Sequence, residues 1–309
     1  YKGAGSFEDM RNLPKTLREK LAQTTVFENI RIVEVQESKT DGTRKYLFEM
    51  PDGEKIESVF MKYRYGNSIC ISSQAGCAMG CRFCRTGTLR FKRNLADYEI
   101  IEQFAHLCHI AEKPITHVVF MGMGEPLANI DNVVSAVSFL HDPEGYNLSH
   151  RRITISTCGL VPGILDLSNR KVPVKLAVSL VTANDEKRSF LMPVNRSFNL
   201  AQLRNALVRF QKVSGRRFTL EYCMIHDMNI SASDADDLKR FCNGLEVVVN
   251  LIPFNPCNEL EFETPTSEEI KSFTSALDKR NIPYTIRISR GRSIKGACGQ
   301  LAGKLQEEA

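Results

Sequence analysis

Three cysteines stand close together in the segment CAMGCRFC. Cys77, Cys81 and Cys84 follow the spacing CxxxCxxC, and thiolates this close can bind three corners of one metal centre. Structural zinc sites use four protein ligands, and ferredoxin-type clusters use four cysteines. No second cysteine pair follows, so the spacing favours a 4Fe-4S cluster with one iron open to a small ligand. Zinc with a distant fourth ligand and three plain core cysteines are the alternatives.

A glycine-rich turn with a carboxylate forms a second motif, GMGEP, at residues 122–126. Glycine lets a backbone approach a ligand closely, and Glu125 could accept hydrogen bonds from an amino group. A tight turn without a ligand would have the same sequence. Ser156 and Ser179 end the next two β-rich runs, where a serine is most often an ordinary loop residue. Read alone, these residues indicate a ligand site only weakly.

The elements that must position these residues alternate from about Ser68 onward. Short β-branched runs and amphipathic stretches of helix length follow one another, which predicts a parallel sheet that closes as a barrel or open barrel. Strands are predicted at Ile69–Ser72, His117–Met121, Arg152–Ser156, Lys175–Leu180, Phe218–Met224, Val247–Pro253 and Tyr284–Ile288. Helices are predicted near 96–111, 130–140, 162–170, 200–213, 232–243 and 267–280. Each motif falls at the carboxyl end of a strand, where such barrels place their chemistry.

The pattern before Ser68 is different. Residues 7–22 predict a helix. Three β-rich segments then predict an antiparallel arrangement, with a Pro-Asp-Gly turn between the last two. These segments are Ile30–Gln36, Arg44–Met50 and Lys55–Lys62.

Composition sets broad limits on the class of protein. The chain has 309 residues, of which 42% are hydrophobic and 25% charged, with a net charge of +5. That charge permits a polyanionic partner without demanding one. No apolar run reaches the roughly 18 residues that span a membrane. The ten cysteines do not resemble a disulfide scaffold, so we expect a reducing, cytoplasmic location.

The surroundings of the cysteines, CISSQAGCAMGCRFCRTGTLRFKRNL, resemble the radical S-adenosylmethionine (SAM) superfamily. Within it they resemble the RNA adenine methyltransferases: the dual-specificity carbon-2 enzymes of ribosomal and transfer RNA and the related carbon-8 resistance enzymes. Further matching segments are MGMGEPL, RRITISTCGLVPGI, RSFLMPVN, VNLIPFNP and GACGQLAG. The resemblance therefore runs from about Phe7 to Gly303.

The resemblance implies an α/β fold, a partial (β/α)6 radical-SAM barrel with a small N-terminal helical and antiparallel β extension. It implies three parts. Residues 1–24 would be the remainder of an accessory helical domain that helps to hold RNA, and residues 25–66 the antiparallel β extension. Residues 67–303 would be the barrel core, with a loop near its C-terminal end that carries a catalytic cysteine.

The resemblance also implies two cofactors and their ligands. A 4Fe-4S cluster would be bound by Cys77, Cys81 and Cys84. SAM, two molecules per turnover, would contact seven residues. These are Gly124, Glu125, Ser156, Ser179, Leu180, Val181 and Asn255. The family commonly reads Ser-Leu-His at 179–181, and Val181 cannot supply an imidazole.

Carbon 2 of adenine is electron-poor, so ordinary polar methyl transfer cannot use it, whereas a carbon radical can add to it. By resemblance, Cys298 is methylated by one SAM. A second SAM is cleaved to a 5′-deoxyadenosyl radical, which abstracts hydrogen from that methyl group. The methylene radical attacks the base and joins enzyme to RNA. Glu57 matches the general base, and Cys70 matches the cysteine that resolves the adduct through a transient disulfide with Cys298. Without the resemblance, these three would pass for a solvated glutamate and unremarkable thiols.

The expected partners are 23S ribosomal RNA, transfer RNA and an electron donor such as flavodoxin or ferredoxin, with no membrane, and the protein is expected to be a monomer. Basic residues beside the motifs predict a phosphate-lined approach to the barrel. They are Arg82, Arg85, Arg90, Lys92, Arg93, Arg151, Arg152, Lys187, Arg188, Arg216, Arg217, Arg287, Arg290, Arg292 and Lys295.

Three other functions remain open at this point. The first is carbon-8 methylation of the same ribosomal adenosine. The second is a zinc- or cluster-stabilised RNA-binding protein without catalysis. The third is a radical enzyme acting on a small molecule or a protein.

Overall fold

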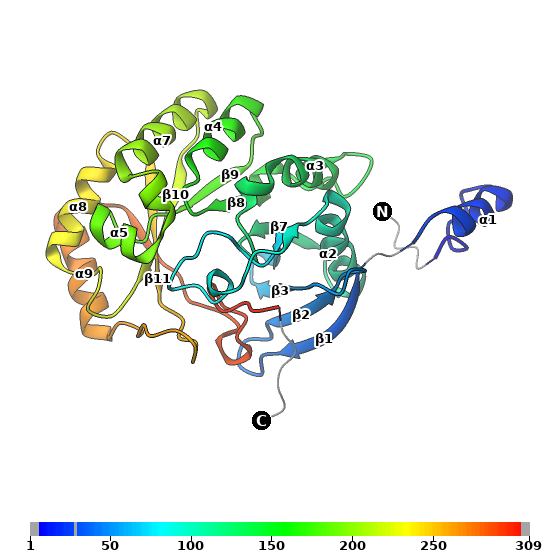
Figure 1. The fold of residues 1–309 in the computed structure, drawn as a ribbon, viewed down its shortest axis with the longest axis horizontal. Coiled ribbons are helices and arrows are strands. Elements are labelled where there is room, and N and C mark those ends of the chain that lie inside the picture. Colours follow the sequence, from blue (N-terminus) through cyan, green and yellow to red (C-terminus); the bar gives the residue numbers. More distant parts are fainter. Residues whose placement is uncertain (1–5, 28–29, 304–309) are drawn as a thin grey trace.

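The fold is known from a computed structural model that describes residues 6–27 and 30–303. One ten-stranded sheet runs through it in the order β1-β2-β3-β4-β7-β8-β9-β10-β11-β12 (Figure 1). Its strands are β1 Arg31–Glu37, β2 Arg44–Glu49, β3 Lys55–Tyr63, β4 Gly66–Cys70, β7 Ile115–Phe120, β8 Ile153–Thr157, β9 Lys175–Ser179, β10 Phe218–Met224, β11 Val247–Pro253 and β12 Tyr284–Ile286. The strands from β4 to β12 pair in parallel, whereas β1 to β4 pair antiparallel.

Helices connect each parallel strand to the next. In chain order they are α2 Asp97–Ile110, α3 Ile130–His141, α4 Val161–Arg170, α7 Leu200–Ser214, α8 Ala232–Cys242 and α9 Ser267–Lys279. They lie on the outer face of the curved sheet (Figure 1). Within the described residues β12 does not pair with β1, so the barrel stays open. The predicted partial (β/α)6 barrel is confirmed.

The helices begin where the sequence supplies caps. Asn199, Ser231 and Thr266 each accept a hydrogen bond from the backbone three residues ahead, and the residue at that position bonds back. Such reciprocal caps satisfy backbone N–H groups that a helix leaves unpaired. Helix α7 then buries an apolar stripe against the sheet, which includes Leu203 and Leu207. Local sequence and burial therefore favour the same element boundaries.

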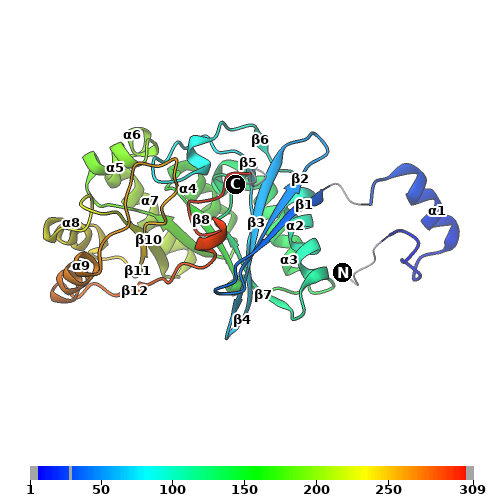
Figure 2. The same ribbon diagram turned by 90° about the horizontal axis from the view of Figure 1, so that it is seen from below.

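Three parts of the fold differ from expectation. The predicted helix over 7–22 is only α1, Lys15–Thr24, because Pro14 has an extended ψ of 143° and lacks the N–H that a continuing helix needs. Helix α1 buries none of its residues and stands apart from the sheet (Figures 1 and 2). Two short helices were not predicted: α5 Asp185–Leu191 and α6 Val194–Ser197. The antiparallel strands β1–β3 continue the main sheet through β4.

Alternation along the parallel strands separates two environments. On β10, Leu220 and Tyr222 are fully buried in the core beneath the helices. The intervening residues Thr219, Glu221 and Cys223 line cavities inside the curved sheet. Because side chains on a strand alternate between faces, every parallel strand supplies residues to the barrel interior. No helix in the described residues is long and apolar enough to cross a membrane.

Arg188 of α5 is fully buried, although the sequence suggested a surface cation near RNA. Its guanidinium donates to the carbonyl oxygens of Leu180 at 3.1 Å and Cys158 at 2.7 Å, and to Asn195 Oδ1 at 2.9 Å. Burial lowers the pKa of Arg188, yet the ordinary value is high enough that the charge remains. Arg188 therefore ties together the carboxyl ends of β8 and β9 and does not face solvent.

We expect Arg188→Ala to lower the free energy of unfolding by about 3 kcal/mol or more, because buried carbonyl groups lose their donor. Arg209→Ala removes only an exposed hydrogen bond to Asn169 and should change that free energy by less than about 0.5 kcal/mol. Urea unfolding followed by circular dichroism compares the two variants. Equal midpoints would contradict the structural role of Arg188.

Candidate active site

A cavity of about 170 Å³ lies at the carboxyl ends of the parallel strands. Its wall includes ten of the predicted site residues: Cys77, Cys81, Cys84, Gly124, Glu125, Ser156, Ser179, Val181, Asn255 and Cys298. They come from the loop after β4, from the ends of β7, β8, β9 and β11, and from the segment that follows β12. The fold thus brings together residues that are up to 221 positions apart, from Cys77 to Cys298.

The three cysteines of the CxxxCxxC motif line one part of this wall. Burial raises the pKa of Cys77 to about 12, and burial also raises the pKa values of Cys81 and Cys84. A bound cation would reverse this preference, because thiolates are the form that ligates metal. Among the described residues, no three His, Cys, Asp or Glu side chains converge on a single metal ion. The donor set fits a polynuclear cluster, in which each cysteine binds a different iron.

The GMGEP turn packs against the segment between β4 and the cysteine loop. Gly124 has a φ of +98°, and an added Cβ would lie 2.5 Å from Cβ of Gln74, so only glycine fits there. Glu125 is buried, and its two oxygens accept from the backbone N–H groups of Leu127 at 3.1 Å and Cys158 at 2.7 Å. Burial raises the pKa of Glu125. This places a fixed carboxylate in the cavity wall.

Asn255 follows β11, and only one of its two amide groups, the Nδ2 donor, has a hydrogen-bond partner among the described residues. Its Nδ2 donates to the carbonyl oxygen of Cys298 at 3.1 Å. Its Oδ1 is buried and has no hydrogen-bond partner. A buried polar atom without a partner is costly, so the cavity presents an acceptor for a ligand N–H or O–H. This observation fits the predicted contact between Asn255 and SAM.

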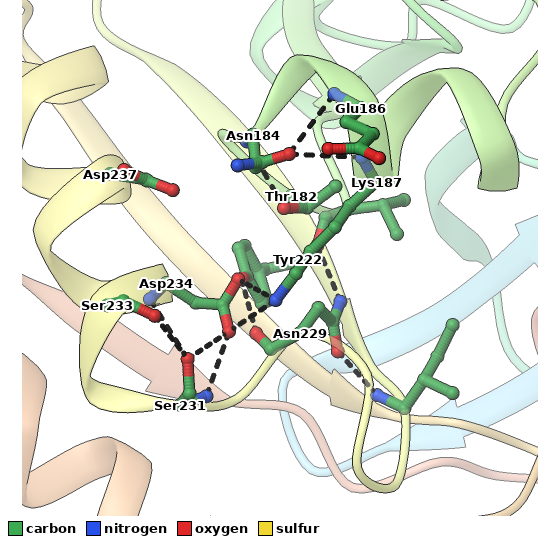
Figure 3. A network of polar contacts seen from close by, with 12 residues as sticks. Thr182, Asn184, Glu186, Lys187, Tyr222, Asn229, Ser231, Ser233, Asp234 and Asp237 are labelled. Carbon is green, nitrogen blue, oxygen red and sulfur yellow. Dashed lines mark hydrogen bonds and ion pairs between the residues drawn. The ribbon is translucent and has the colours of Figure 1, made fainter.

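Val181 has an uncommon backbone conformation for its residue type. Its φ is +64°, and a β-branched residue in this left-handed region is strained. The carbonyl oxygen of Val181 accepts from Nδ2 of Asn229 at 2.7 Å, and the same nitrogen donates to the carbonyl of Cys223 at 2.7 Å. Asn229 therefore holds the carboxyl ends of β9 and β10 together (Figure 3). Leu180 lies in the core and not on the cavity wall.

A second polar contact joins the same two βα units. Lys187 of α5, in the unit that follows β9, forms an ion pair with Asp234 near the start of α8, with its Nζ 2.8 Å from Oδ1 of Asp234 (Figure 3). Oδ2 of Asp234 also accepts a hydrogen bond from the hydroxyl of Ser231, at 2.5 Å. Lys187, like Arg188, is therefore engaged in structure, which corrects its expected role as a free RNA-facing charge.

The segment 296–303 lies against the cysteine loop. The backbone N–H of Arg85 donates to the carbonyl of Gly299 at 2.7 Å, and the Thr86 hydroxyl donates to the carbonyl of Leu301 at 2.7 Å. Together with the bond from Asn255, these contacts fix the backbone at Cys298 and directly after it. Cys298 lines the same cavity as Cys77, Cys81 and Cys84.

Cys70 and Cys298 both line a second, small cavity of about 20 Å³. Cys298 therefore borders both cavities. Cys70, the last residue of β4, is buried, and burial raises its pKa to about 12. Arg287, just after β12, also lines both cavities and opposes this rise. The structure brings the predicted cysteine pair together.

Glu57 lines neither cavity. It is buried on β3, where its Oε1 lies 2.8 Å from Nζ of Lys45 and its Oε2 accepts from the N–H groups of Ala302 at 2.6 Å and Gly303 at 3.1 Å. It shares a strand face with Val59, two positions on, which lines the second cavity. The observed contacts make Glu57 an anchor of the segment that carries Cys298.

The sequence missed Glu221 and Cys223, which face the cavity, and burial raises the pKa of Glu221. Arg287, predicted only as one of many cations near RNA, also lines this cavity. Glu221 also accepts from Nδ2 of Asn250 at 2.7 Å. Alternation along β10 would have placed Glu221 and Cys223 inward once the helix-facing residues were assigned. No local motif marks Arg287.

Comparison with known proteins agrees with this geometry. A profile described as the radical SAM superfamily matches residues 71–238. A radical SAM methyltransferase from Sphaerobacter thermophilus has a solved structure that is similar with a TM-score of 0.94 and 42% identity, over 97% of this chain and 89% of that one. A spore photoproduct lyase variant, 12% identical with a TM-score of 0.51 over 89% of this chain and 86% of that one, shares the fold alone.

Two relatives match nearly the whole chain. The dual-specificity RNA methyltransferase RlmN of Geotalea uraniireducens is 44% identical over 98% of this chain and 88% of its own length. The probable dual-specificity RNA methyltransferase RlmN of Lachnospira eligens is 41% identical over 99% of this chain and 87% of its own.

A partial barrel with three cysteines in the wall of its carboxyl-end cavity defines a radical SAM enzyme. Within that superfamily, the chain belongs to the RlmN family of dual-specificity RNA methyltransferases. The resemblance found in the sequence is thereby confirmed.

Replacing Cys77 with alanine should abolish binding of a 4Fe-4S cluster, because each thiolate holds a different iron. Cys108→Ala, on α2 and away from the cavity, should retain it. Iron and sulfide analysis after anaerobic reconstitution, together with visible absorption, measures both. Full iron content in Cys77→Ala would place the cluster on other ligands.

Proposed function

We propose that this protein methylates carbon 2 of an adenosine in 23S ribosomal RNA and in transfer RNA, through a methyl-cysteine and a covalent RNA adduct. The observation that carries the proposal is the position of Cys298. Its thiol borders the cavity of the cluster cysteines and also the cavity that contains Cys70. One sulfur can therefore receive a methyl group on one side and be resolved by a second thiol on the other.

Two cofactors are part of the proposal, with two SAM molecules used per turnover. Bound together, the cluster and SAM would supply a methyl group and the radical that activates it. Cys77, Cys81 and Cys84 would hold the cluster. SAM would lie against Gly124, Glu125, Ser156, Ser179, Val181 and Asn255, all of which line the same cavity. Leu180 would act only through its position in the strand end, because its side chain is in the core.

The chain's own residues divide the remaining work. Cys298 would take the methyl group on its sulfur and carry the carbon to the base. Once carbon and base are joined and the adduct has given up its one unpaired electron and the carbon-2 proton, the Cys70 thiolate would form an S–S bond with Cys298. The electron pair of the broken bond between the Cys298 sulfur and the methylene carbon would stay with that carbon, which takes up a proton and becomes the methyl group. Arg287 favours the thiolate of Cys70 by its positive charge. The shared cavity supports this order because both cysteines border it.

Glu57 is proposed as the base that accepts the proton from carbon 2. Two observations support it: its family-matched position, and its location on the face of β3 that continues into the cavity of the two cysteines. Its contacts with Ala302 and Gly303 also link it to the segment that carries Cys298. Proton transfer and placement of Cys298 would thus depend on one side chain.

The remaining parts of the proposal concern organisation and partners. Residues 1–24 would be the end of an accessory helical domain, residues 25–66 a β extension and residues 67–303 the catalytic core. A flavodoxin or ferredoxin would supply electrons. The protein would act as a cytoplasmic monomer.

The identity of the methylated nucleoside tests the proposal. Reconstituted enzyme, reductant, SAM and a 23S ribosomal RNA fragment are incubated anaerobically, and the digested RNA is analysed by mass spectrometry against standards. We expect 2-methyladenosine. 8-Methyladenosine would instead assign the chain the resistance-type activity, and 5′-deoxyadenosine without any methyladenosine would reject RNA adenine as the substrate.

The two cysteine variants should fail in different ways. Cys298→Ala should give neither methylated enzyme nor methylated RNA, because no sulfur accepts the methyl group. Cys70→Ala should accumulate a covalent RNA–protein adduct, because nothing resolves it. Denaturing gel electrophoresis with labelled RNA separates the outcomes, and Cys242→Ala, on α8, is the matched control. Normal turnover by Cys70→Ala would reject its resolving role.

A further inference from the structure

A third opening leads into the barrel from the amino ends of its strands. This cavity, of about 760 Å³, is lined by inward-facing residues near the starts of the parallel strands, including His117, Thr154, Lys175 and Thr219. It shares Met121, Glu221 and Arg287 with the cavity that contains the cluster cysteines. The opening of this cavity is here called the lower mouth, and these three residues are all that the cavity shares with the one that contains Cys298.

The lower mouth carries positive charges that no acidic side chain neutralises. Lys175 and Arg217 are exposed there and form no ion pair in the described part of the chain. Arg290 donates to the backbone carbonyl of Asp41, at 3.4 Å, and is not part of an ion pair among the described residues. The two acidic side chains of this lining have other hydrogen-bond partners: Asp41 accepts from the N–H groups of Gly291 and Thr43, and Glu221 accepts from Nδ2 of Asn250. Cations without partners favour phosphate groups.

Aromatic rings stand beside these charges. Tyr63 and Tyr65 stack with centroids 4.9 Å apart and an angle of 11° between their planes. The guanidinium of Arg290 lies 4.7 Å from the Tyr63 ring, and His117 meets the Tyr65 ring edge to face at 5.4 Å. Tyr65 is nevertheless 66% exposed. A supported ring with an open surface next to cations is the arrangement that stacks unpaired bases.

The carboxyl side of the barrel has fewer unpaired cations that could bind the phosphates of RNA. Several basic residues there are already paired with carboxylates. The pairs are Arg85–Glu259, Lys92–Glu54, Arg93–Glu99 and Lys187–Asp234. The segment 296–303 also lies against the cysteine loop on that side, bonded through Gly299 and Leu301.

From these observations we propose that RNA enters through the lower mouth, with the phosphates next to Lys175, Arg217 and Arg290. A base flanking the target adenosine stacks on Tyr65. The target base itself passes Met121, Glu221 and Arg287 to reach Cys298. This inference rests on the proposed function, because it concerns how that RNA substrate is held. It assigns Tyr65 as a binding residue and specifies an unpaired segment as the recognised form of the RNA.

Fluorescence anisotropy with reconstituted enzyme and a fluorescein-labelled RNA hairpin, whose loop contains adenosines, tests the inference. Tyr65→Ala should weaken binding roughly tenfold, because one stacked base is lost. Tyr65→Phe keeps the ring and should bind as the wild type does. Tyr98→Ala removes an exposed tyrosine on α2, outside the cavity, and should also leave the affinity unchanged.

Salt dependence gives a second readout on the same hairpin. Lys175→Ala should make the slope of log affinity against log salt shallower by about 0.7, the value for one contact with a single strand. Arg209→Ala, on the outer helix α7, should leave the slope unchanged. Arg82→Ala probes the carboxyl side, where Arg82 lies over Phe190, and should likewise have no effect.

Three results would overturn the inference: unchanged affinity in Tyr65→Ala, an equal loss in Tyr98→Ala, or a larger loss in Arg82→Ala. The proposed function fails separately. If the wild type produces methyladenosine while Tyr65→Ala binds normally, the proposed function stands and RNA entry through the lower mouth is rejected. If Tyr65 is needed for binding but no methyladenosine forms, RNA entry through the lower mouth stands and the proposed methylation of adenosine is rejected. A wild type that does not bind the hairpin rejects both.

Discussion

The site depends on how the segment 296–303 is held across the carboxyl end of the barrel. Its backbone is bonded by the cysteine loop, by Asn255 after β11 and by Glu57 on β3. These anchors lie 43 to 246 positions away in sequence, so the segment can be ordered only when the whole sheet has formed. The antiparallel strands at the edge of the sheet are consequently part of the site, since Lys45 on β2 pairs with Glu57 on β3.

The interior is divided along the strands. Residues near the carboxyl ends are small or weakly polar, such as Ser156 and Ser179, and surround the cysteines. Residues near the amino ends include Lys175 and other polar groups that face a wide opening. Arg287 lines all three cavities. The two regions adjoin at Met121, Glu221 and Arg287, because inward-facing residues recur along every parallel strand.

Much of the fold could be predicted because its elements are regular. Strands β10 and β11 have the predicted bounds, since β-branched runs bounded by helices are unambiguous. The prediction that the first helix begins at residue 7 was wrong, because Pro14 prevents a helix from continuing through it despite the apolar spacing on both sides. Arg188 was misplaced because nothing local distinguishes a buried arginine from an exposed one; its partners Cys158 and Asn195 come together only in the fold. The cysteine triplet was found through its spacing and the other predicted site residues through the family resemblance, whereas Asn229 has no local signal and owes its position to tertiary contacts.

The anchoring of residues 296–303 also bears on how the enzyme matures during synthesis. These residues follow every strand of the barrel, so they leave the ribosome after the cysteine loop has done so, and domains fold from the N-terminal side as they emerge. Until Gly299 and Leu301 dock on Arg85 and Thr86, the loop is uncovered and open to the machinery that delivers iron and sulfide. Docking of the last segment would then cover the cysteine loop and bring Cys298 to the cavity wall in one event. A nascent chain without this segment would be a metal-loading intermediate that has no means to modify RNA.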